Sequence, residues 1–172
     1  VDLERFSPNL KHNRATKNKT LKFIMVSRLL KAKGVIEYLK AAKIVKNRFP
    51  EVKFDLAGFC DSNGRNYVSS KEIQEWEEEG VINFLFKVDK VEQLLRDYDC
   101  VVLPSYYSEG TPRILLEASS MNKVCISTDN VGCRDAIDDE ETGFLCKIKD
   151  EIDLAAKMEK VVKMTNSKRR EM

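Results

Sequence analysis

The sequence predicts an α/β domain with a doubly wound, Rossmann-like parallel sheet of about six strands and helices on both faces. Short apolar runs alternate with segments of helical period along most of the chain. The apolar runs are continuous, which is typical of parallel strands that are covered on both faces. Strands and helices that alternate at these lengths favour parallel strands joined by crossover helices. In such a sheet, ligands bind beyond the carboxyl ends of the strands.

The first half of the chain contains two strand–helix units. The run LKFIMVS at 21–27 predicts a buried strand, and apolar residues at helical spacing over 35–49 predict a helix that the next proline ends. The run VKFDLAG at 52–58 predicts the second strand. The charged segment 69–80, which ends in glycine, predicts the second helix.

The middle of the chain continues the alternation. The run VINFLF at 81–86 predicts a third strand, and VEQLLRDY at 91–98 predicts a short helix with Asp89 near its N-cap. Residues 99–103 then form the fourth expected strand. Asp97 and Asp99 have the spacing of a metal–diphosphate site, but they lie at the start of this strand, opposite the ligand edge. We interpret them as structural, and we predict no metal site.

The last part of the chain supplies two strands and two helices. Residues 123–128 predict the fifth strand, and 142–148 a short sixth strand. Between them, a short helix is expected over 134–137. The final helix is expected over 150–164.

The stretch that follows the fourth strand predicts an anion site. A polar loop follows Pro104, and Thr111 and Pro112 suit the N-cap and first position of a helix. Backbone donors at Arg113 and Ile114 would then be free, and such a helix end attracts anions.

Two glutamates bracket this helix start. Glu109 lies in the loop, and Glu117 lies about a turn and a half into the helix, among apolar neighbours. A buried carboxylate needs a partner or a ligand, whereas a solvated one needs neither. Phosphate at the helix end, with carboxylates on either side to accept hydroxyl hydrogen bonds, suits a sugar nucleotide.

Two cations follow the first strand. Arg28 and Lys33 stand five residues apart in a loop whose Gly34 could begin the next helix. They could straddle a diphosphate, the arginine through its planar fork and the lysine as a point charge. Ordinary surface charge is the alternative interpretation.

Composition excludes several classes of protein. Thirty basic and 28 acidic side chains leave a net charge of +2, which gives no nucleic-acid footprint. No apolar run approaches the length of a membrane helix, and the N-terminus has no signal-peptide core. Five cysteines without a CxxC pair favour buried free thiols in a reducing compartment. We therefore expect a cytoplasmic protein.

The sequence lacks the motifs of two other classes of nucleotide-binding enzyme. The sequence contains neither GxGxxG after the first strand nor GxxxxGK[ST], which argues against a dinucleotide oxidoreductase and a P-loop enzyme. The single histidine, His12, has no neighbouring nucleophile.

The expected organisation is a linker segment at 1–20, one nucleotide-sugar donor-binding domain at 21–165 and a charged tail at 166–172. The tail sequence SKRRE could contact an anionic membrane surface, and solvated charge is the alternative.

Five motifs together resemble a known family: SRLLKAKG, EVKFDLAG, DYDCVVLPSYYSEGTPRILLEA, VCISTDNVG and ETGFL. Their succession resembles the carboxyl-terminal, donor-binding domain of the retaining glycosyltransferases of family 4, or group 1, which have the two-domain B-type (GT-B) fold. Glu109 and Glu117 match the family's E-x7-E signature. The resemblance covers nearly the whole chain.

The resemblance implies roles for individual residues. Arg28 and Lys33 would hold the donor diphosphate, Glu109 would hydrogen-bond the transferred sugar, and Glu117 would bind the ribose hydroxyls. Further donor contacts would come from Gly58 and Val88 near the base, and from Gly110, Thr111 and Arg113 near the sugar and phosphates.

The resemblance also implies the chemistry. Transfer would retain anomeric configuration without an active-site metal or another cofactor, from a UDP-sugar, such as a UDP-N-acetylhexosamine, to a glycan or lipid-linked acceptor in bacterial polysaccharide or lipopolysaccharide synthesis. The amino-terminal acceptor domain would be a partner outside this chain, so the chain alone should be inactive. A nucleotide-phosphate-binding or interaction module without transfer chemistry is the alternative.

Five positions depart from the family pattern: Lys87, Asn122, Val124, Cys133 and Asp135. Lys87 occupies a place usually filled by glycine, and Asn122 replaces a common glycine after the helix of Glu117. Asparagine tolerates the left-handed conformation of a helix stop, so the second change is mild.

Overall fold

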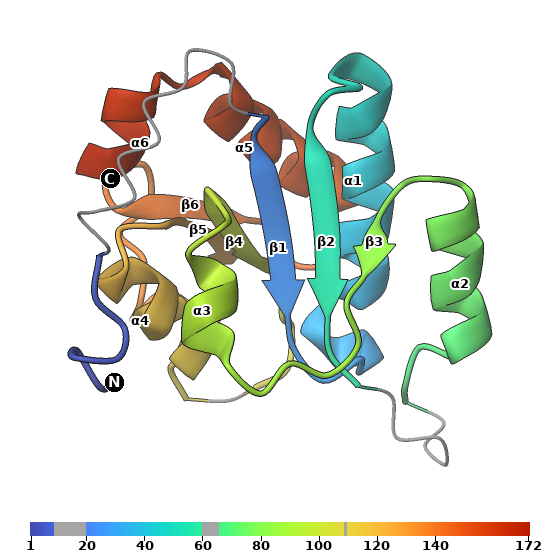
Figure 1. Cartoon of the computed structure of the whole chain (residues 1–172), viewed down its shortest axis with the longest axis horizontal. Helices are drawn as coiled ribbons and strands as arrows, with labels where there is room; N and C mark the ends of the chain where they lie inside the picture. Colours follow the sequence, from blue (N-terminus) through green and yellow to red (C-terminus); the bar gives the residue numbers. More distant parts are fainter. Residues whose placement is uncertain (9–19, 60–65, 109) are drawn as a thin grey trace.

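A single parallel sheet with the strand order β3-β2-β1-β4-β5-β6 organises the chain (Figure 1). The computed structural model describes residues 1–8, 20–59, 66–108 and 110–172. Every neighbouring pair of strands is parallel. In Figure 1, α1 and α5 lie behind the sheet, and α3 and α4 lie in front of it. The predicted doubly wound α/β fold is therefore confirmed.

The elements follow the predicted order. The strands are β1 (Lys22–Val26), β2 (Lys53–Ala57), β3 (Asn83–Phe84), β4 (Cys100–Leu103), β5 (Val124–Thr128) and β6 (Gly143–Cys146). The helices are the 3-10 helix η1 (Lys31–Lys33), then α1 (Val35–Arg48), α2 (Ser70–Glu78), α3 (Val91–Leu95), α4 (Arg113–Ser120), α5 (Glu151–Lys163) and α6 (Asn166–Glu171).

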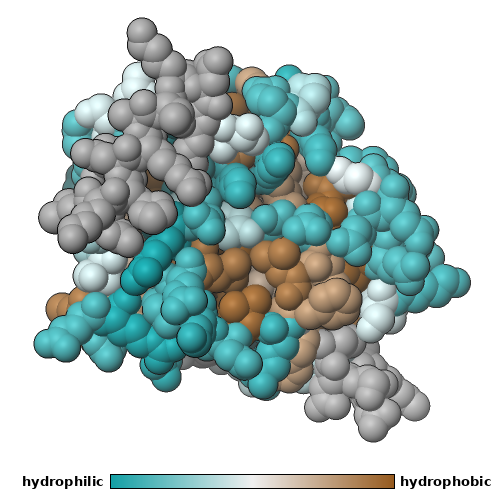
Figure 2. Space-filling model, viewed as in Figure 1, coloured by the Kyte–Doolittle hydropathy of each residue, from teal (hydrophilic) through white to brown (hydrophobic). Residues whose placement is uncertain are grey.

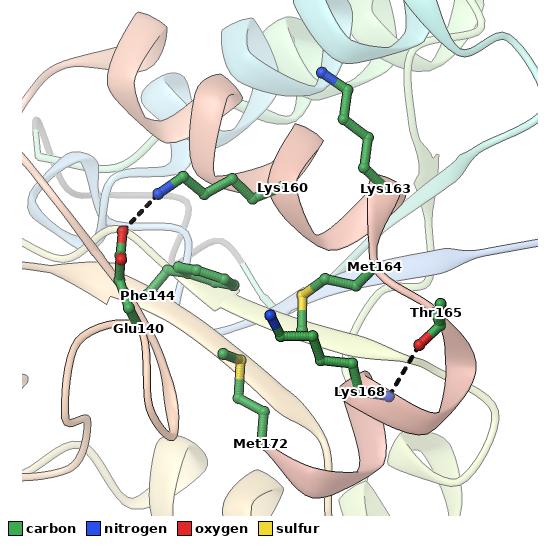
Figure 3. A pocket seen from close by; sticks show the side chains of 8 residues that line it. All are labelled: Glu140, Phe144, Lys160, Lys163, Met164, Thr165, Lys168 and Met172. Atoms are coloured by element: carbon green, nitrogen blue, oxygen red, sulfur yellow. Dashed lines mark hydrogen bonds and ion pairs between the residues drawn. The ribbon is translucent and has the colours of Figure 1, made fainter.

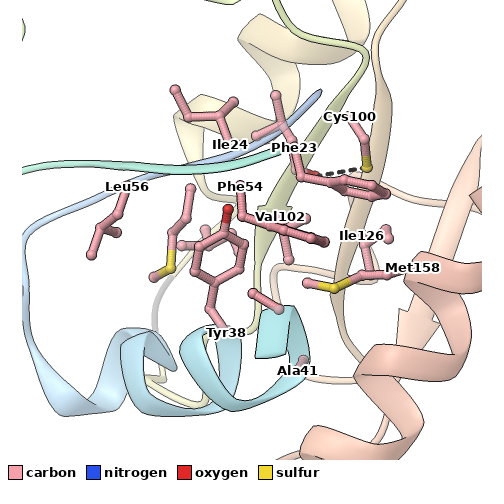
Figure 4. Close-up of a cluster of buried hydrophobic side chains, with 14 of the residues drawn as sticks. Phe23, Ile24, Tyr38, Ala41, Phe54, Leu56, Cys100, Val102, Ile126 and Met158 are labelled. Carbon is pink, nitrogen blue, oxygen red and sulfur yellow. Dashed lines mark hydrogen bonds between the residues drawn. The ribbon is translucent and has the colours of Figure 1, made fainter. Parts of the chain in front are cut away.

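The main core lies between the centre of the sheet and α1 with α5 (Figure 4). The rings of Phe23 and Phe54, on the adjacent strands β1 and β2, stack with their centroids 5.0 Å apart. Tyr38 of α1 meets Phe54 edge-on at 6.4 Å, and its hydroxyl donates to the backbone oxygen of Asp55 at 2.9 Å. Met158 brings α5 into the same cluster. These contacts join β1 and β2 to α1 and α5.

Two predicted helix caps are wrong. Pro112 is itself the N-cap of α4, with an extended ψ of 121°, so the helix begins at Arg113 and Thr111 lies outside it. Pro112 makes no side-chain cap bond to the helix. Likewise, the N-cap of α3 is Lys90, without a side-chain cap bond, and not Asp89.

The helix predicted over 134–137 is also wrong. This stretch forms isolated turns, such as the hydrogen bond from the Arg134 N–H to the Asn130 oxygen at 3.1 Å. Gly132, two residues before this stretch, has a φ of 81°, so a right-handed helix cannot extend back to it.

The segment expected to be a charged tail contains the short helix α6. The Thr165 hydroxyl caps it by accepting from the Lys168 N–H at 3.2 Å. The Arg169 guanidinium donates to the Val161 oxygen at 2.9 Å and also to the Met164 oxygen, so it ties α6 to the end of α5. Sequence composition alone showed only the charge of this segment.

Two residues with left-handed backbone conformations lie at or next to positions where the family pattern has glycine. Asn122, after α4, has a φ of 54°, which confirms the predicted helix stop. In the loop after β3, Phe86 has a φ of 54°, so the left-handed position lies next to Lys87, which replaces a glycine of the family pattern.

Residues at the amino end of the sheet have structural roles. A carboxylate oxygen of Asp99 accepts the Lys22 N–H at 3.0 Å, which supports the structural interpretation of this residue. Four cysteines are buried free thiols, as predicted, and burial raises the pKa of Cys125 to about 11. Cys60 and His12 lie outside the described residues.

The surface on the side of the molecule seen in Figure 1 contains both apolar and hydrophilic residues. Figure 2 shows apolar residues gathered over β1 and β2, surrounded by hydrophilic side chains. Within the described ranges, no helix has both the length and the apolar content to span a bilayer.

Two glycines allow the loops at the carboxyl ends of the strands to touch. A Cβ on Gly34, whose φ is 79°, would lie 2.1 Å from the Pro104 oxygen after β4. A Cβ on Gly58 would lie 2.1 Å from the Ser27 oxygen after β1. Both distances are far inside van der Waals contact, so only glycine permits these backbones to approach.

We predict that Gly34→Ala lowers the free energy of unfolding by several kcal/mol, because the new methyl group meets backbone and the residue keeps a left-handed φ. Gly80→Ala is the matched control: its φ is 70°, but no atom lies within 4 Å of its Cβ, so only the conformational cost of about 1–2 kcal/mol applies. Urea denaturation of both variants measures the difference. Equal destabilisation would contradict the role of the Pro104 contact.

Candidate functional site

The loop after β1 is tied to the loop after β4 through one carbonyl group. The Ala32 oxygen in η1 accepts from the Tyr106 N–H at 2.9 Å and from the Tyr107 N–H at 3.1 Å. Thr128 at the end of β5 donates its hydroxyl hydrogen to the Ser105 oxygen, which holds the second loop from the other side. The segment that carries Lys33 therefore lies against the segment that leads into α4.

The loop after β1 also forms backbone hydrogen bonds with the loop after β2. The Leu29 N–H donates to the Phe59 oxygen at 3.2 Å, and the Val68 N–H donates to the Leu29 oxygen at 2.8 Å. The Lys31 N–H donates to the Asn66 oxygen at 2.8 Å. Three loops at the carboxyl edge of the sheet thus form one hydrogen-bonded unit.

The two predicted cations differ in their surroundings. Arg28 is exposed and lies two residues after the end of β1. Lys33 is only 8% exposed, and its Nζ lies 5.5 Å from the centroid of the Tyr107 ring. A lysine held under a ring has fewer conformations than a surface lysine, so its position is well defined.

The start of α4 retains free backbone donors, although the cap differs from the prediction. Its first residue, Arg113, is exposed, Gly110 is exposed, and Thr111 is partly exposed. Pro112 makes no side-chain cap bond, and the Leu115 N–H already donates to the Pro112 oxygen at 3.1 Å, so the N–H groups of Arg113 and Ile114 are the donors that an anion would meet. Glu109, the predicted partner of the transferred sugar, lies outside the described residues.

Glu117 is partly buried, so the structure favours the poorly solvated one of the two interpretations that the sequence left open. Its side chain is 13% exposed, and Oε1 lies 3.8 Å from the guanidinium of Arg113, one turn earlier in α4. Burial raises the pKa of Glu117, while the charges of Arg113 and Arg5 oppose this rise. A carboxylate this poorly solvated gains from hydroxyl donors.

The remaining predicted residues lie at the ends of β2 and β3. The Gly58 N–H donates to the Phe86 oxygen at 2.8 Å, which joins the two strand ends. Val88, two residues later, is partly buried and packs against the core. Gly58 and the loop of Val88 are therefore neighbours.

One charged residue near this site was missed by sequence reasoning. Arg5 in the segment before β1 forms an ion pair with Glu92 of α3 at 2.8 Å, and its charge reaches Glu117. The adjacent Phe6 is 5% exposed within the core. No sequence pattern links positions 87 residues apart, so this contact had no signal.

A cavity of about 450 Å³ lies elsewhere, between β6 and the helices α5 and α6 (Figure 3). Phe144, Met164 and Met172 give it an apolar lining, and the ammonium group of Lys160 binds Glu140 at 2.5 Å. In Figure 1, α6 lies at the end of the sheet opposite the strand arrowheads. The cavity includes none of the predicted site residues.

Curated relatives share this sequence pattern over part of their length. The chain is 33% identical over 135 residues to the N,N'-diacetylbacillosaminyl-diphospho-undecaprenol alpha-1,3-N-acetylgalactosaminyltransferase of Campylobacter jejuni. The match covers 78% of this chain and 34% of that protein, so the chain spans about a third of the relative's length.

Solved structures share the fold. HepE of Anabaena, in complex with UDP, matches with a TM-score of 0.83 at 19% identity, over 99% of this chain and 48% of that one. The C-terminal domain of a group 1 glycosyltransferase of Francisella tularensis matches with a TM-score of 0.78 at 22% identity. That match covers 99% of this chain and 90% of the other.

The family itself follows from a match over nearly the whole sequence. The family model described as "Glycosyl transferases group 1" matches residues 7–172. The chain belongs to the group 1 glycosyltransferases.

Proposed function

We propose that this chain is the donor-binding half of a retaining glycosyltransferase that transfers a sugar from a UDP-sugar to a glycan or lipid-linked acceptor. The observation that carries the proposal is the joining of the loops after β1 and β4 through the Ala32 oxygen. It sets the loop of Arg28 and Lys33 beside the loop that leads to the uncapped start of α4. Cations beside free helix donors suit a diphosphate.

In the proposed reaction, each group acts on a different part of the donor. Arg28 and Lys33 stabilise the negative charge that develops on the leaving diphosphate. Glu117 accepts hydrogen bonds from the ribose hydroxyls, and Glu109 accepts one from the transferred sugar. Gly110, Thr111 and Arg113 contact sugar or phosphate.

The finer chemistry is part of the proposal. The acceptor attacks the face of the sugar that the diphosphate leaves, and a diphosphate oxygen assists its deprotonation, so configuration is retained. No active-site metal takes part. A UDP-linked N-acetylhexosamine is our proposed donor, which agrees with the name of the Campylobacter relative.

The partners are proposed for the whole protein. An amino-terminal domain would complete the cleft and bind the acceptor, so the 172-residue chain alone would bind donor without transferring sugar. A lipid-linked acceptor would bring the whole protein to the cytoplasmic face of the membrane. Within the segment SKRRE, Arg169 donates to the end of α5 and is therefore not a free surface charge.

We predict that Arg28→Ala and Lys33→Ala each weaken binding of UDP and of inorganic pyrophosphate by about tenfold or more, because charge-assisted bonds to phosphate are lost. Isothermal titration calorimetry measures both ligands. Lys43→Ala is the control, since Lys43 is a lysine of α1 that pairs with Glu79 at 2.7 Å. If Lys33→Ala behaves like this control, Lys33 does not bind the diphosphate.

We predict that the affinity for UDP falls as the pH is lowered toward the raised pKa of Glu117. Only the ionised carboxylate accepts bonds from both ribose hydroxyls, so the interaction is present above this pKa and lost below it. Glu117→Gln should weaken binding by about tenfold at neutral pH and remove this part of the pH dependence. Protonation of UDP contributes equally to the pH profiles of the unmodified chain and of Glu117→Gln. Parallel profiles of UDP affinity would therefore exclude Glu117 as the ribose partner.

A further inference from the structure

Phe86, in the loop after β3, combines two unfavourable features. Its φ of 54° lies in the left-handed region, which is strained for a bulky side chain. Its side chain is 69% exposed, so an aromatic ring lies largely in water. Glycine would remove both features. Local strain that persists in a structure is a reason to look for a function.

The position of Phe86 points to the candidate site. Its backbone oxygen accepts the Gly58 N–H at 2.8 Å, at the place where the carboxyl ends of β2 and β3 meet. Its ring lies 4.6 Å from the ring of Phe84, tilted by 47°, which supports it from one side. Phe59, directly after Gly58, is 45% exposed. Two exposed aromatic side chains therefore follow neighbouring strands at the ligand edge.

We propose that Phe86 is a nucleobase-binding residue of the donor site whose ring stacks on the base of the donor, with Phe59 beside it. The inference rests on the proposed function and deepens it. Arg28 and Lys33 would hold the diphosphate, while the rings after β2 and β3 would hold the opposite end of the nucleotide.

Stacking explains why a ring is placed on this strained backbone. A base that covers the ring removes its apolar surface from water, and base–aromatic stacking changes affinity by about tenfold or more. Every base has a π-face, so the ring distinguishes nucleotides from phosphates without a base. A ring that only filled the core would be buried, as Phe54 is at 2% exposure.

The test compares Phe86→Gly and Phe86→Tyr with the unmodified 172-residue chain, by calorimetric titration with UDP and with inorganic pyrophosphate. Phe86→Gly should weaken UDP binding by about tenfold or more and leave pyrophosphate binding unchanged. Phe86→Tyr, which keeps the ring, should retain the affinity for UDP. The Tm of Phe86→Gly should not fall below that of the unmodified chain, because glycine relieves the left-handed strain. If Phe86→Gly does not fold, Phe86→Asn provides the same comparison, since asparagine tolerates this conformation.

Each other outcome overturns a defined part of the argument. Unchanged UDP affinity in Phe86→Gly overturns the stacking role and leaves the proposed function standing. Equal loss of UDP and pyrophosphate also overturns it, because the ring would then shape the phosphate site. An unmodified chain that binds neither ligand overturns the proposed function and this inference together.

Discussion

The contact between the loop after β1 and the loop after β4 is the constraint on which the candidate site depends. Gly34 approaches the Pro104 carbonyl so closely that no side chain can stand between them, and the Ala32 oxygen accepts two N–H groups from the opposite loop. Both loops begin at adjacent central strands of a sheet whose core is packed on both faces. Backbone contacts, supported by this rigid sheet, therefore determine how the segment of Lys33 lies relative to the start of α4.

Charge and burial are distributed over this edge in a consistent way. Lys33 lies against the Tyr107 ring with little exposure, and Arg28 of the same loop is exposed, so one cation is held in place and the other is accessible. Glu117 is desolvated enough to raise its pKa, and the charges of Arg113 and Arg5 limit that rise. Anionic phosphate would be stabilised by Arg28 and Lys33, and neutral hydroxyls would donate hydrogen bonds to Glu117. Such an edge favours a ligand that carries both, as a nucleoside diphosphate sugar does.

Sequence periodicity was sufficient for the order of strands and helices, because buried parallel strands and amphipathic helices leave strong patterns. Local backbone geometry was not predictable in the same way. The N-cap of α4 is Pro112 and not Thr111, and no pattern in the sequence predicted the left-handed backbone of Phe86 after β3. Both depend on the tertiary contacts of the loops. The ion pair of Arg5 joins segments far apart in sequence, so only the fold reveals it. The position of Arg28 and Lys33 at the carboxyl edge could be predicted, because the residues that follow each strand of a parallel sheet lie at that edge.

The central claim is that the carboxyl edge of the sheet binds the nucleotide of the donor. NMR titration of this chain with UDP tests it most directly, because each backbone amide reports its own surroundings. The account predicts shifts that concentrate at Lys33, Gly58, Phe86 and the first turn of α4, with α5 and α6 unaffected. Shifts confined to the cavity lined by Phe144, or unaltered spectra at millimolar UDP, would contradict it.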